Sequence, residues 1–233
     1  MAKTYFVTGT DTAVGKTFIA AALLKAAEAK GLSTAAIKPV AAGCEEVDGE
    51  LKNDDAILLQ QIMSKKFDYA EVNPVALPQP IAPHLAATAA GKNMTVSRLA
   101  GYCRGTLIRA GQFNIVEGAG GWRVPINHRE TMADLVRELQ LPVILVVGVR
   151  LGCINHTLLT VEAILRDGLS IAGWVANCID PDMPCQQENI DSISQRLVFP
   201  LLGTVGFIKS DDLIASVRLA ADDLCIDNLL AVS

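Results

Sequence analysis

A glycine-containing loop near the amino terminus constrains the fold of this chain more than any other feature. Tyr5–Thr8 is a short apolar run typical of a strand, and the next nine residues read Gly-Thr-Asp-Thr-Ala-Val-Gly-Lys-Thr. An apolar helical pattern follows directly over Thr17–Lys30. In a strand, a loop ending in Gly-Lys-Thr and a helix, backbone N–H groups and the helix N-terminus surround a phosphate group. The sequence therefore predicts a site for the phosphates of a nucleotide.

The residue types in this loop predict roles for individual side chains. Lys16 is expected to reach the β- and γ-phosphates, and the hydroxyl of Thr17 is expected to ligate Mg²⁺. The predicted nucleotide contacts within the loop are Ala13, Val14, Gly15, Lys16 and Thr17. The first glycine, Gly9, lies one position earlier than in the general pattern, so the loop belongs to a variant family.

Strand-like and helix-like segments alternate along the chain. The predicted strands are Tyr5–Thr8, Thr34–Val40, Phe113–Glu117, Val143–Val149, Ile171–Ile179 and Leu201–Val205. The predicted helices are Thr17–Lys30, Asp54–Lys65, Val96–Ala110, Met132–Leu139, His156–Asp167 and Gln186–Leu197. Several strands are continuously apolar, as parallel strands covered on both faces are. This order predicts a single α/β domain over residues 1–233 with a doubly wound, mostly parallel sheet that binds ligands beyond the carboxyl ends of its strands.

Composition excludes several classes of protein. With 51% apolar residues the chain is too hydrophobic to be disordered, and its net charge of −5 argues against a nucleic-acid-binding surface. No apolar run reaches the length of a membrane span, and a strand beginning by Thr4 leaves no room for a signal peptide. The six cysteines lack Cys-x-x-Cys spacing, so we expect neither a disulfide framework nor a zinc site. These properties predict a cytoplasmic protein.

Two charged side chains end predicted strands near the phosphate loop. Lys38 precedes Pro39, which cannot continue a central strand, and is either a second cation for a transferring phosphoryl group or a solvated lysine. Glu117 follows apolar strand residues and precedes three glycines within four positions. An acid at this place is the expected Mg²⁺ partner of the phosphate-loop threonine.

Three further segments carry polar groups that suit either a ligand or a local structural role. Asn53, Asp54 and Asp55 open a helix, where Asn53 or Asp54 is expected as the cap and one of the two aspartates is a candidate Mg²⁺ ligand. The stretch Gly148–His156 precedes another helix and offers N–H groups to a substrate carboxylate. Asn177 ends the fifth strand and suits either an adenine edge or a turn. The proline-containing stretch Tyr69–Pro83 is expected to be irregular, as a lid, a substrate loop or a plain connector.

In combination these segments resemble dethiobiotin synthetase. The resemblance is carried by the loop over 9–17, Lys38-Pro39-Val40, Val116–Gly121, Pro142–Asn155 and Gly173–Asn177, and it is weakest after Asp180. It implies a P-loop NTPase fold and a cytoplasmic homodimer that uses ATP and Mg²⁺ in biotin biosynthesis. Such an enzyme converts diaminopelargonic acid, CO₂ and ATP to dethiobiotin, ADP and phosphate, through a carbamate that ATP phosphorylates and that the second amine then attacks.

The resemblance also implies site residues. The implied catalytic contacts to the carbamate and the migrating phosphoryl group are Thr12, Lys16 and Lys38. The implied Mg²⁺ ligands are Thr17, Asp55 and Glu117. Beyond the loop, the implied nucleotide contacts are Asp55, Glu117, Gly118, Asn177, Gly206, Phe207 and Ile208. The implied substrate contacts are Thr12, Lys38, Ala42, Leu151, Gly152, Cys153, Ile154 and Asn155.

The sequence departs from the commonest family pattern in the loop and beside Lys38. Ala13 stands where the loop usually has Glu, and Ala42 stands where Ser is usual. A lost hydrogen bond typically costs about 0.5–1.5 kcal/mol, so these departures predict weaker substrate binding rather than a different reaction.

The main alternative is a partitioning- or carrier-type ATPase of the same variant-loop group, without synthetase activity. Such proteins usually carry an additional lysine early in the loop, where this chain has Thr10-Asp11-Thr12. They also often use basic or amphipathic surfaces for DNA or membranes, which this acidic chain lacks.

Overall fold

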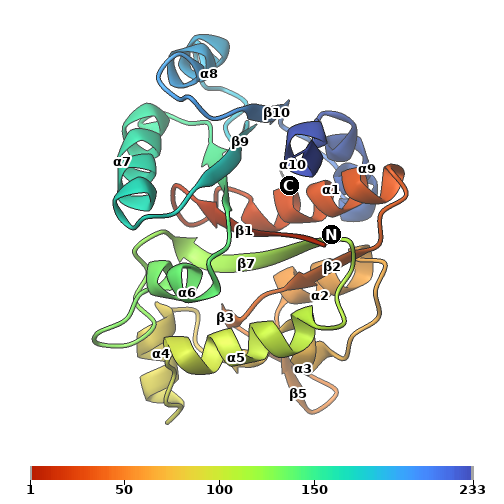
Figure 1. The fold of residues 1–233 in the computed structure, drawn as a ribbon, viewed down its shortest axis with the longest axis vertical. Helices are drawn as coiled ribbons and strands as arrows, with labels where there is room; N and C mark the ends of the chain where they lie inside the picture. Colours follow the sequence, from red (N-terminus) through yellow and green to blue (C-terminus); the bar gives the residue numbers. More distant parts are fainter. Residues whose placement is uncertain (1, 232–233) are drawn as a thin grey trace.

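A parallel six-stranded sheet forms the centre of the computed structural model, which describes residues 2–231 (Figure 1). Its strands are β1 (Lys3–Gly9), β2 (Thr34–Ile37), β7 (Phe113–Gly121), β8 (Val143–Gly148), β9 (Ile171–Asn177) and β10 (Leu201–Val205). They lie in the order β10-β9-β8-β1-β7-β2, and every neighbouring pair is parallel. The predicted parallel sheet is confirmed, and it brings the carboxyl ends of all six strands to one edge.

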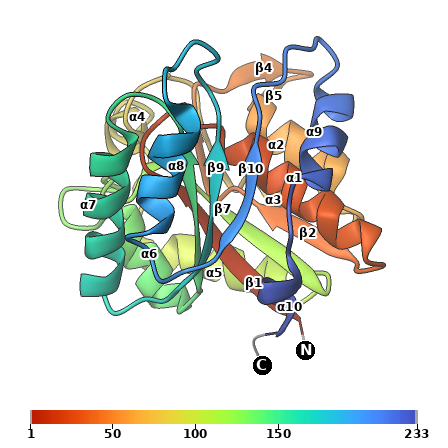
Figure 2. The same cartoon turned by 90° about the horizontal axis from the view of Figure 1, so that it is seen from above.

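Helices cover both faces of the sheet, as the doubly wound arrangement requires (Figure 2). One face carries α1 (Lys16–Ala29), α2 (Asp54–Ile62) and α9 (Leu213–Asp222), and the other carries α5 (Val96–Leu107), α6 (Met132–Leu139), α7 (Cys153–Arg166) and α8 (Gln186–Ser194). The short helix α10 (Asp227–Ala231) lies near the start of β1, where the Tyr5 hydroxyl donates to the Leu229 carbonyl. Within the described residues, no helix is both long and apolar enough to cross a bilayer.

Neighbouring strand residues bury their side chains in two separate apolar clusters, one on each face. Phe6 and Leu145 belong to one cluster, whereas Val7 and Ile144 belong to the other. All four side chains are fully buried, which accounts for the continuously apolar strands in the sequence.

The predicted second strand, Thr34–Val40, is wrong at its carboxyl end. Strand β2 ends at Ile37, because the Lys38 N–H donates to the Val72 carbonyl and Pro39 has no N–H for a ladder. The chain then forms β3 (Val40–Ala42), which pairs with β6 (Val75–Leu77) in a small separate sheet. Because the strand ends here, Lys38 lies just beyond the carboxyl end of β2 rather than within the sheet.

The stretch Tyr69–Pro83 is more regular than the sequence predicts. It contains α3 (Tyr69–Val72) and β6, and α4 (Pro83–Ala89) begins at its end. An antiparallel hairpin of β4 (Glu45–Val47) and β5 (Glu50–Lys52) lies between β3 and α2.

Other predicted boundaries are also corrected. The helices predicted over 54–65, 96–110 and 186–197 each end three residues earlier, at Ile62, Leu107 and Ser194. Strand β7 continues through the glycines to Gly121. A Cβ on Gly118 would lie only 2.9 Å from the Phe6 ring, so glycine allows β7 to pack closely against β1 at this point. Helix α7 begins at Cys153 rather than at His156, after Gly152 in a left-handed conformation. Helices α9 and α10 were not predicted.

Candidate active site

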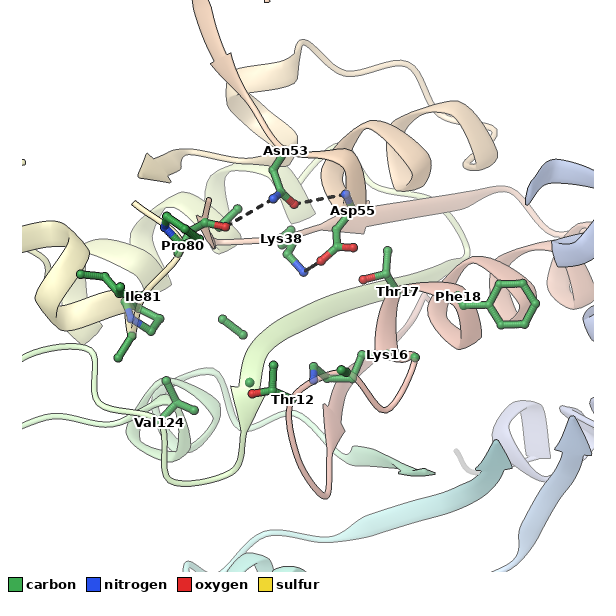
Figure 3. A pocket seen from close by; sticks show the side chains of 18 of the residues that line it. Thr12, Lys16, Thr17, Phe18, Lys38, Asn53, Asp55, Pro80, Ile81 and Val124 are labelled. Atoms are coloured by element: carbon green, nitrogen blue, oxygen red, sulfur yellow. Dashed lines mark hydrogen bonds and ion pairs between the residues drawn. The ribbon is translucent and has the colours of Figure 1, made fainter. Parts of the chain in front are cut away.

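A cavity of about 780 Å³ opens at the carboxyl edge of the sheet. The phosphate loop and the start of α1 form one wall, and the turn from Pro80 to Pro83 forms another (Figure 3). Lys38 lies between these walls, at the end of β2. A cavity at this position follows from the fold, since parallel sheets bind ligands beyond the carboxyl ends of their strands.

The phosphate loop adopts a curled conformation between β1 and α1. Ala13 and Gly15 both have positive φ values, of 57° and 80°. At the loop's base, a Cβ on Gly9 would lie 2.5 Å from the Val14 side chain, so glycine is required there for close packing. Left-handed residues at positions 13 and 15 curve the backbone, and successive N–H groups in such a curve can bind an anion.

Lys16 is buried and donates a hydrogen bond to the carbonyl of Asp11, at 3.0 Å. Burial lowers the pKa of its ammonium group, because the charged form loses water. The nearby Glu117 carboxylate opposes this shift, whereas Lys38 adds to it. The ammonium is therefore held at the loop and poorly hydrated. Little water would have to be removed when it pairs with a phosphate oxygen.

Asn177 ties the end of β9 to the phosphate loop. Its side-chain Nδ2 donates to the Val14 carbonyl at 2.9 Å, in a buried position. A Cβ on Gly15 would lie 2.2 Å from the same nitrogen, so only glycine fits between this amide and α1. The structure gives Asn177 a loop-fixing contact that the sequence could not reveal.

Four polar side chains meet beside the loop at the centre of the site. The Lys38 Nζ lies 2.6 Å from Asp55 Oδ2 and 2.6 Å from Glu117 Oε1. The Thr17 hydroxyl donates to the same Glu117 oxygen at 2.7 Å. The sequence predicted each of these four residues for the site, and the structure brings them together from β2, α2, β7 and α1.

The charged groups in this cluster shift one another's pKa values. Burial alone would lower the pKa of the Lys38 ammonium, but the Glu117 and Asp55 charges outweigh burial and hold that pKa above its usual value. Burial alone would raise the pKa of the Asp55 carboxyl, and the Lys38 ammonium holds it below the usual range instead. Lys38 is therefore charged and Asp55 ionised at neutral pH.

The donor set of this cluster fits a magnesium ion. Thr17, Asp55 and Glu117 offer only oxygen atoms, which Mg²⁺ prefers. Glu117 is fully buried, and its Oε2 has no hydrogen-bond partner, so this carboxylate oxygen is free to accept a cation. The two carboxylates of the cluster face the Lys38 ammonium, and the nearby Lys16 ammonium also attracts both of them. No group of three or more His, Cys, Asp or Glu side chains is found in residues 2–231, so two acids and a hydroxyl are the available donors.

Asp55 owes its position to the start of α2. Asn53 caps this helix, because its side chain accepts a hydrogen bond from the Asp55 N–H at 3.2 Å. Asn53 also donates to the Ala42 carbonyl, which joins the cap to β3. The cap is thus Asn53, one of the two residues predicted for it, and Asp55 is left to pair with Lys38 (Figure 3).

The structure brings only part of the predicted set to the cavity. The predicted residues that line it are Thr12, Ala13, Gly15, Lys16, Thr17, Lys38, Ala42 and Asp55. The predicted residues that do not line it are Val14, Glu117, Gly118, Leu151, Gly152, Cys153, Ile154, Asn155, Asn177, Gly206, Phe207 and Ile208. Of the second set, Glu117 reaches the site through its hydrogen bonds to Thr17 and Lys38.

The predicted carboxylate site over Leu151–Asn155 and the predicted adenine border over Gly206–Ile208 both lie at carboxyl ends of strands. The first follows β8, with Leu151 exposed and Cys153 buried in the first turn of α7. The second follows β10, with the Phe207 side chain half exposed. Both segments thus lie at the same edge of the sheet as the phosphate loop, but neither lines the cavity.

Several cavity residues were missed by sequence reasoning. Phe18, Leu58, Val124, Pro125 and Leu213 line the cavity, and nothing in their local sequence marks them. Pro80, Ile81 and Pro83 also line it, and here a signal existed, because their proline-containing stretch was a candidate substrate loop.

Comparisons with known proteins identify relatives over most of the chain. A family described as "AAA domain" matches residues 3–211. The ATP-dependent dethiobiotin synthetase BioD of Cellvibrio japonicus is 56% identical over 203 residues, which cover 87% of this chain and 89% of that protein. The protein of the same name from Marinobacter nauticus is 50% identical, covering 91% of this chain and 92% of that protein.

Solved structures with the same fold are more distant in sequence. The septum site-determining protein MinD of Pyrococcus horikoshii, complexed with Mg-ADP, has a TM-score of 0.57 at 16% identity and covers 99% of this chain and 98% of that one. A ParA family ATPase from Chlorobium tepidum has a TM-score of 0.58 at 12% identity and covers both chains completely. At these identities the similarity establishes the P-loop NTPase-like fold alone.

Proposed function

Because this chain belongs to the ATP-dependent dethiobiotin synthetase family, we propose that its cavity holds ATP and diaminopelargonic acid together with CO₂. The chain is a ligase that forms dethiobiotin in biotin biosynthesis, as relatives at 50–56% identity indicate. One observation carries the assignment of the cavity: Lys16, at the start of α1, and Lys38, just after β2, both line it. We assign the whole chain, residues 1–233, to one synthetase domain.

ATP is expected to bind along the phosphate loop. The backbone over Ala13–Gly15 would surround the phosphates, and Lys16 would leave the Asp11 carbonyl for the phosphate oxygens. The Asn177 amide nitrogen is already used on Val14, so its oxygen remains as an acceptor for the adenine amino group. The segment Gly206–Ile208 would border the base, with Gly118 close to the phosphates.

Mg²⁺ is expected to be held by Thr17, Asp55 and Glu117. The unpartnered Oε2 of Glu117 supports this assignment, as does the grouping of two carboxylates and the Thr17 hydroxyl at one point. When bound, Mg²⁺ would neutralise charge on the phosphate oxygens. Lys38 lies between two carboxylates that are also the proposed ligands, so its ammonium would turn toward the substrate as the cation takes its place.

The acceptor is expected to occupy the remainder of the cavity. CO₂ adds to one amine of diaminopelargonic acid to give a carbamate, and Thr12, Lys16 and Lys38 would contact that carbamate and the phosphoryl group moving to it. The second amine then attacks, closes the cyclic urea and releases phosphate. Two lysines placed beside the transferred group would stabilise its charge, so positioning and electrostatics supply the catalysis without a covalent nucleophile.

The far end of the substrate would lie toward α7. The backbone over Leu151–Asn155 offers N–H groups at the start of this helix to the substrate carboxylate. Ala42 lines the cavity without a hydroxyl group and would contact the substrate only through its methyl group.

The partitioning-ATPase alternative is not favoured. The ParA and MinD structures share the fold at 12% and 16% identity, whereas the synthetases share half or more of the aligned residues. The region of the loop in which such ATPases usually carry a further lysine reads Thr10-Asp11-Thr12 here.

A homodimer in the cytoplasm is part of the proposal. Leu151, Leu159 and Leu165 are exposed along α7 and its start, at 92%, 56% and 47%. An apolar stripe beside the proposed carboxylate site supports a second copy packing there. Light scattering at assay concentration tests this: the expected mass is twice 24.7 kDa, and a monomer that is fully active would contradict it.

The decisive assay combines the purified protein with Mg²⁺-ATP, bicarbonate and diaminopelargonic acid. The expected result is phosphate release that depends on the diamine, together with dethiobiotin detected by mass spectrometry. Phosphate release that proceeds equally without the diamine would overturn the synthetase assignment. Replacing ATP with other nucleoside triphosphates in the same assay measures base selectivity.

A further inference from the structure

An ion pair joins the tip of the phosphate loop to the segment that follows β8. Arg150 Nη2 lies 2.5 Å from Asp11 Oδ2, across 139 residues of sequence. The two side chains are 40% and 45% exposed, and neither residue lines the cavity. Exposed ion pairs contribute little to folding stability, so stability gives only a weak account of this pair.

Asp11 is bonded to both loop residues that are expected to act on the transferred group. Its Oδ1 accepts a hydrogen bond from the Thr12 N–H at 2.7 Å. Its carbonyl accepts the hydrogen bond from Lys16 Nζ at 3.0 Å. The orientation of Asp11 therefore fixes the backbone at Thr12 and the resting position of the Lys16 ammonium.

Arg150 is fixed at its other end by the edge of the sheet. Its carbonyl accepts the Cys153 N–H at 3.0 Å in the turn that begins α7. The preceding Val149 N–H donates to the Asn177 carbonyl at 2.7 Å. The guanidinium thus extends from a rigid base to the loop tip.

The charge of Asp11 matters because it lies beside a site for anions. Its carboxylate is one of the charges that attract the Lys16 ammonium. Without a cation beside it, this carboxylate would hold Lys16 at the loop and repel incoming phosphate oxygens. Arg150 supplies the compensating charge.

We propose that Arg150 is a positioning residue that neutralises and orients Asp11, so that Lys16 can move to the phosphate and Thr12 stays directed at the acceptor. This inference rests on the proposed function, since it takes Lys16 and Thr12 as the residues that act on the transferred group. Arg150 itself does not line the cavity.

The test compares Arg150→Gln, Arg150→Lys and the double variant Asp11→Asn/Arg150→Gln in the full-length protein. R150Q is expected to lower kcat/KM for ATP about tenfold and to weaken binding of a fluorescent ATP analogue about fivefold, because Asp11 is left uncompensated. R150K is expected to stay within about threefold of the parent, since it keeps the charge. The double variant is expected to recover to within about threefold, because the uncompensated carboxylate is gone while its Asn still accepts the Thr12 N–H.

The matched control is Arg104→Gln. Arg104 pairs with Glu138 at 2.8 Å, with side chains 55% and 46% exposed, between α5 and α6 and away from the cavity. This variant is expected to change neither kcat/KM nor nucleotide binding. Raising the salt concentration should narrow the R150Q deficit, because the Asp11 charge is partly exposed and is screened.

Two results would overturn the inference. An R150Q protein with unchanged kinetics would leave Arg150 without a role. A double variant as impaired as R150Q would mean that the pair acts by shape rather than by charge. Failure of the proposed function is distinct from both: the parent protein would then release no diamine-dependent phosphate, while nucleotide binding to R150Q and to the double variant would still report on Arg150.

Discussion

Lys38 and Glu117 form a buried ion pair that satisfies only one side of the carboxylate. Lys38 Nζ lies 2.6 Å from Oε1, while Oε2 is buried without a partner. A buried carboxylate oxygen left without a hydrogen bond costs free energy, so this arrangement is not one that folding alone would select. The unpartnered oxygen supports the proposed role of Glu117 as a Mg²⁺ ligand.

Replacing Lys38 with alanine is expected to abolish turnover while ATP binding largely survives. The ammonium would stabilise charge on the transferring phosphoryl group, and loss of one such donor typically lowers kcat by about 10²–10³. Diamine-dependent phosphate release and the Kd for a fluorescent ATP analogue measure the two effects. Lys92→Ala is the control, because Lys92 binds the Ala76 carbonyl outside this cavity.

Near-normal dethiobiotin formation by the Lys38 variant would remove this lysine from the mechanism. Since the change also leaves Glu117 without its counter-ion, thermal denaturation should accompany the kinetics. Lys38→Arg, which keeps the charge, separates loss of folding from loss of chemistry.

Glu117→Gln is expected to raise the Mg²⁺ concentration for half-maximal activity by about tenfold or more, because a neutral amide is a poorer ligand for a hard cation. Removal of Mg²⁺ with a chelator should stop phosphate release in the parent protein. Glu138→Gln, at an exposed position on α6, should leave the Mg²⁺ dependence unchanged. An identical Mg²⁺ dependence in the Glu117 variant would exclude this carboxylate from the metal site.

Gly15→Ala and Gly31→Ala form a matched pair of substitutions. Both glycines have nearly the same φ, 80° and 78°, but a Cβ on Gly15 would lie 2.2 Å from Asn177 whereas a Cβ on Gly31 meets nothing within 4 Å. Both variants should lose roughly 1–2 kcal/mol of stability from left-handed backbone strain. Only the Gly15 variant should lose ATP binding, by about 50-fold or more, measured by calorimetry. Equal ATP affinity in the two variants would show that the Asn177 contact does not shape the loop.

Asp134→Ala is expected to destabilise α6 by about 1 kcal/mol at pH 7, because Asp134 and Thr131 cap this helix reciprocally. Burial would raise the pKa of the Asp134 carboxyl, but hydrogen bonds from the Thr131 N–H and hydroxyl hold it below its usual value. A depressed pKa means that the ionised form stabilises the fold above the unfolded-state pKa of about 4 and that this stability is lost as the pH falls through the native value.

Urea unfolding at several pH values measures the Asp134 effect. The difference between parent and variant should be constant from pH 7 to about 5 and should shrink below pH 4. Asp182→Ala, at an exposed position in the turn before α8, serves as the control. A difference that persists unchanged in acid would contradict a role for the ionised carboxylate.

Local sequence was sufficient to predict the fold and the centre of the site. The strand–loop–helix pattern around Lys16 and the apolar runs predicted the six main strands along the chain, although not their order within the sheet. Parallel strands place their carboxyl ends together, and therefore Lys38 and Glu117, predicted separately, meet at one point.

Contacts between distant segments could not be predicted in the same way. Strands β3 and β6 pair across an intervening hairpin and two helices, α2 and α3, so the regular structure of Tyr69–Pro83 could not be recognised from local sequence. The Asn177 contact to Val14 and the Arg150 pair with Asp11 each join segments more than 130 residues apart. No local pattern encodes such a contact, because it depends on where the loops of neighbouring strands come to lie.

Ala13 stores backbone strain in the phosphate loop. An alanine with φ of 57° costs roughly 1–2 kcal/mol relative to a right-handed conformation, and packing elsewhere in the fold must offset that cost. The loop conformation is therefore maintained by the tertiary structure around it rather than by the local preference of this residue.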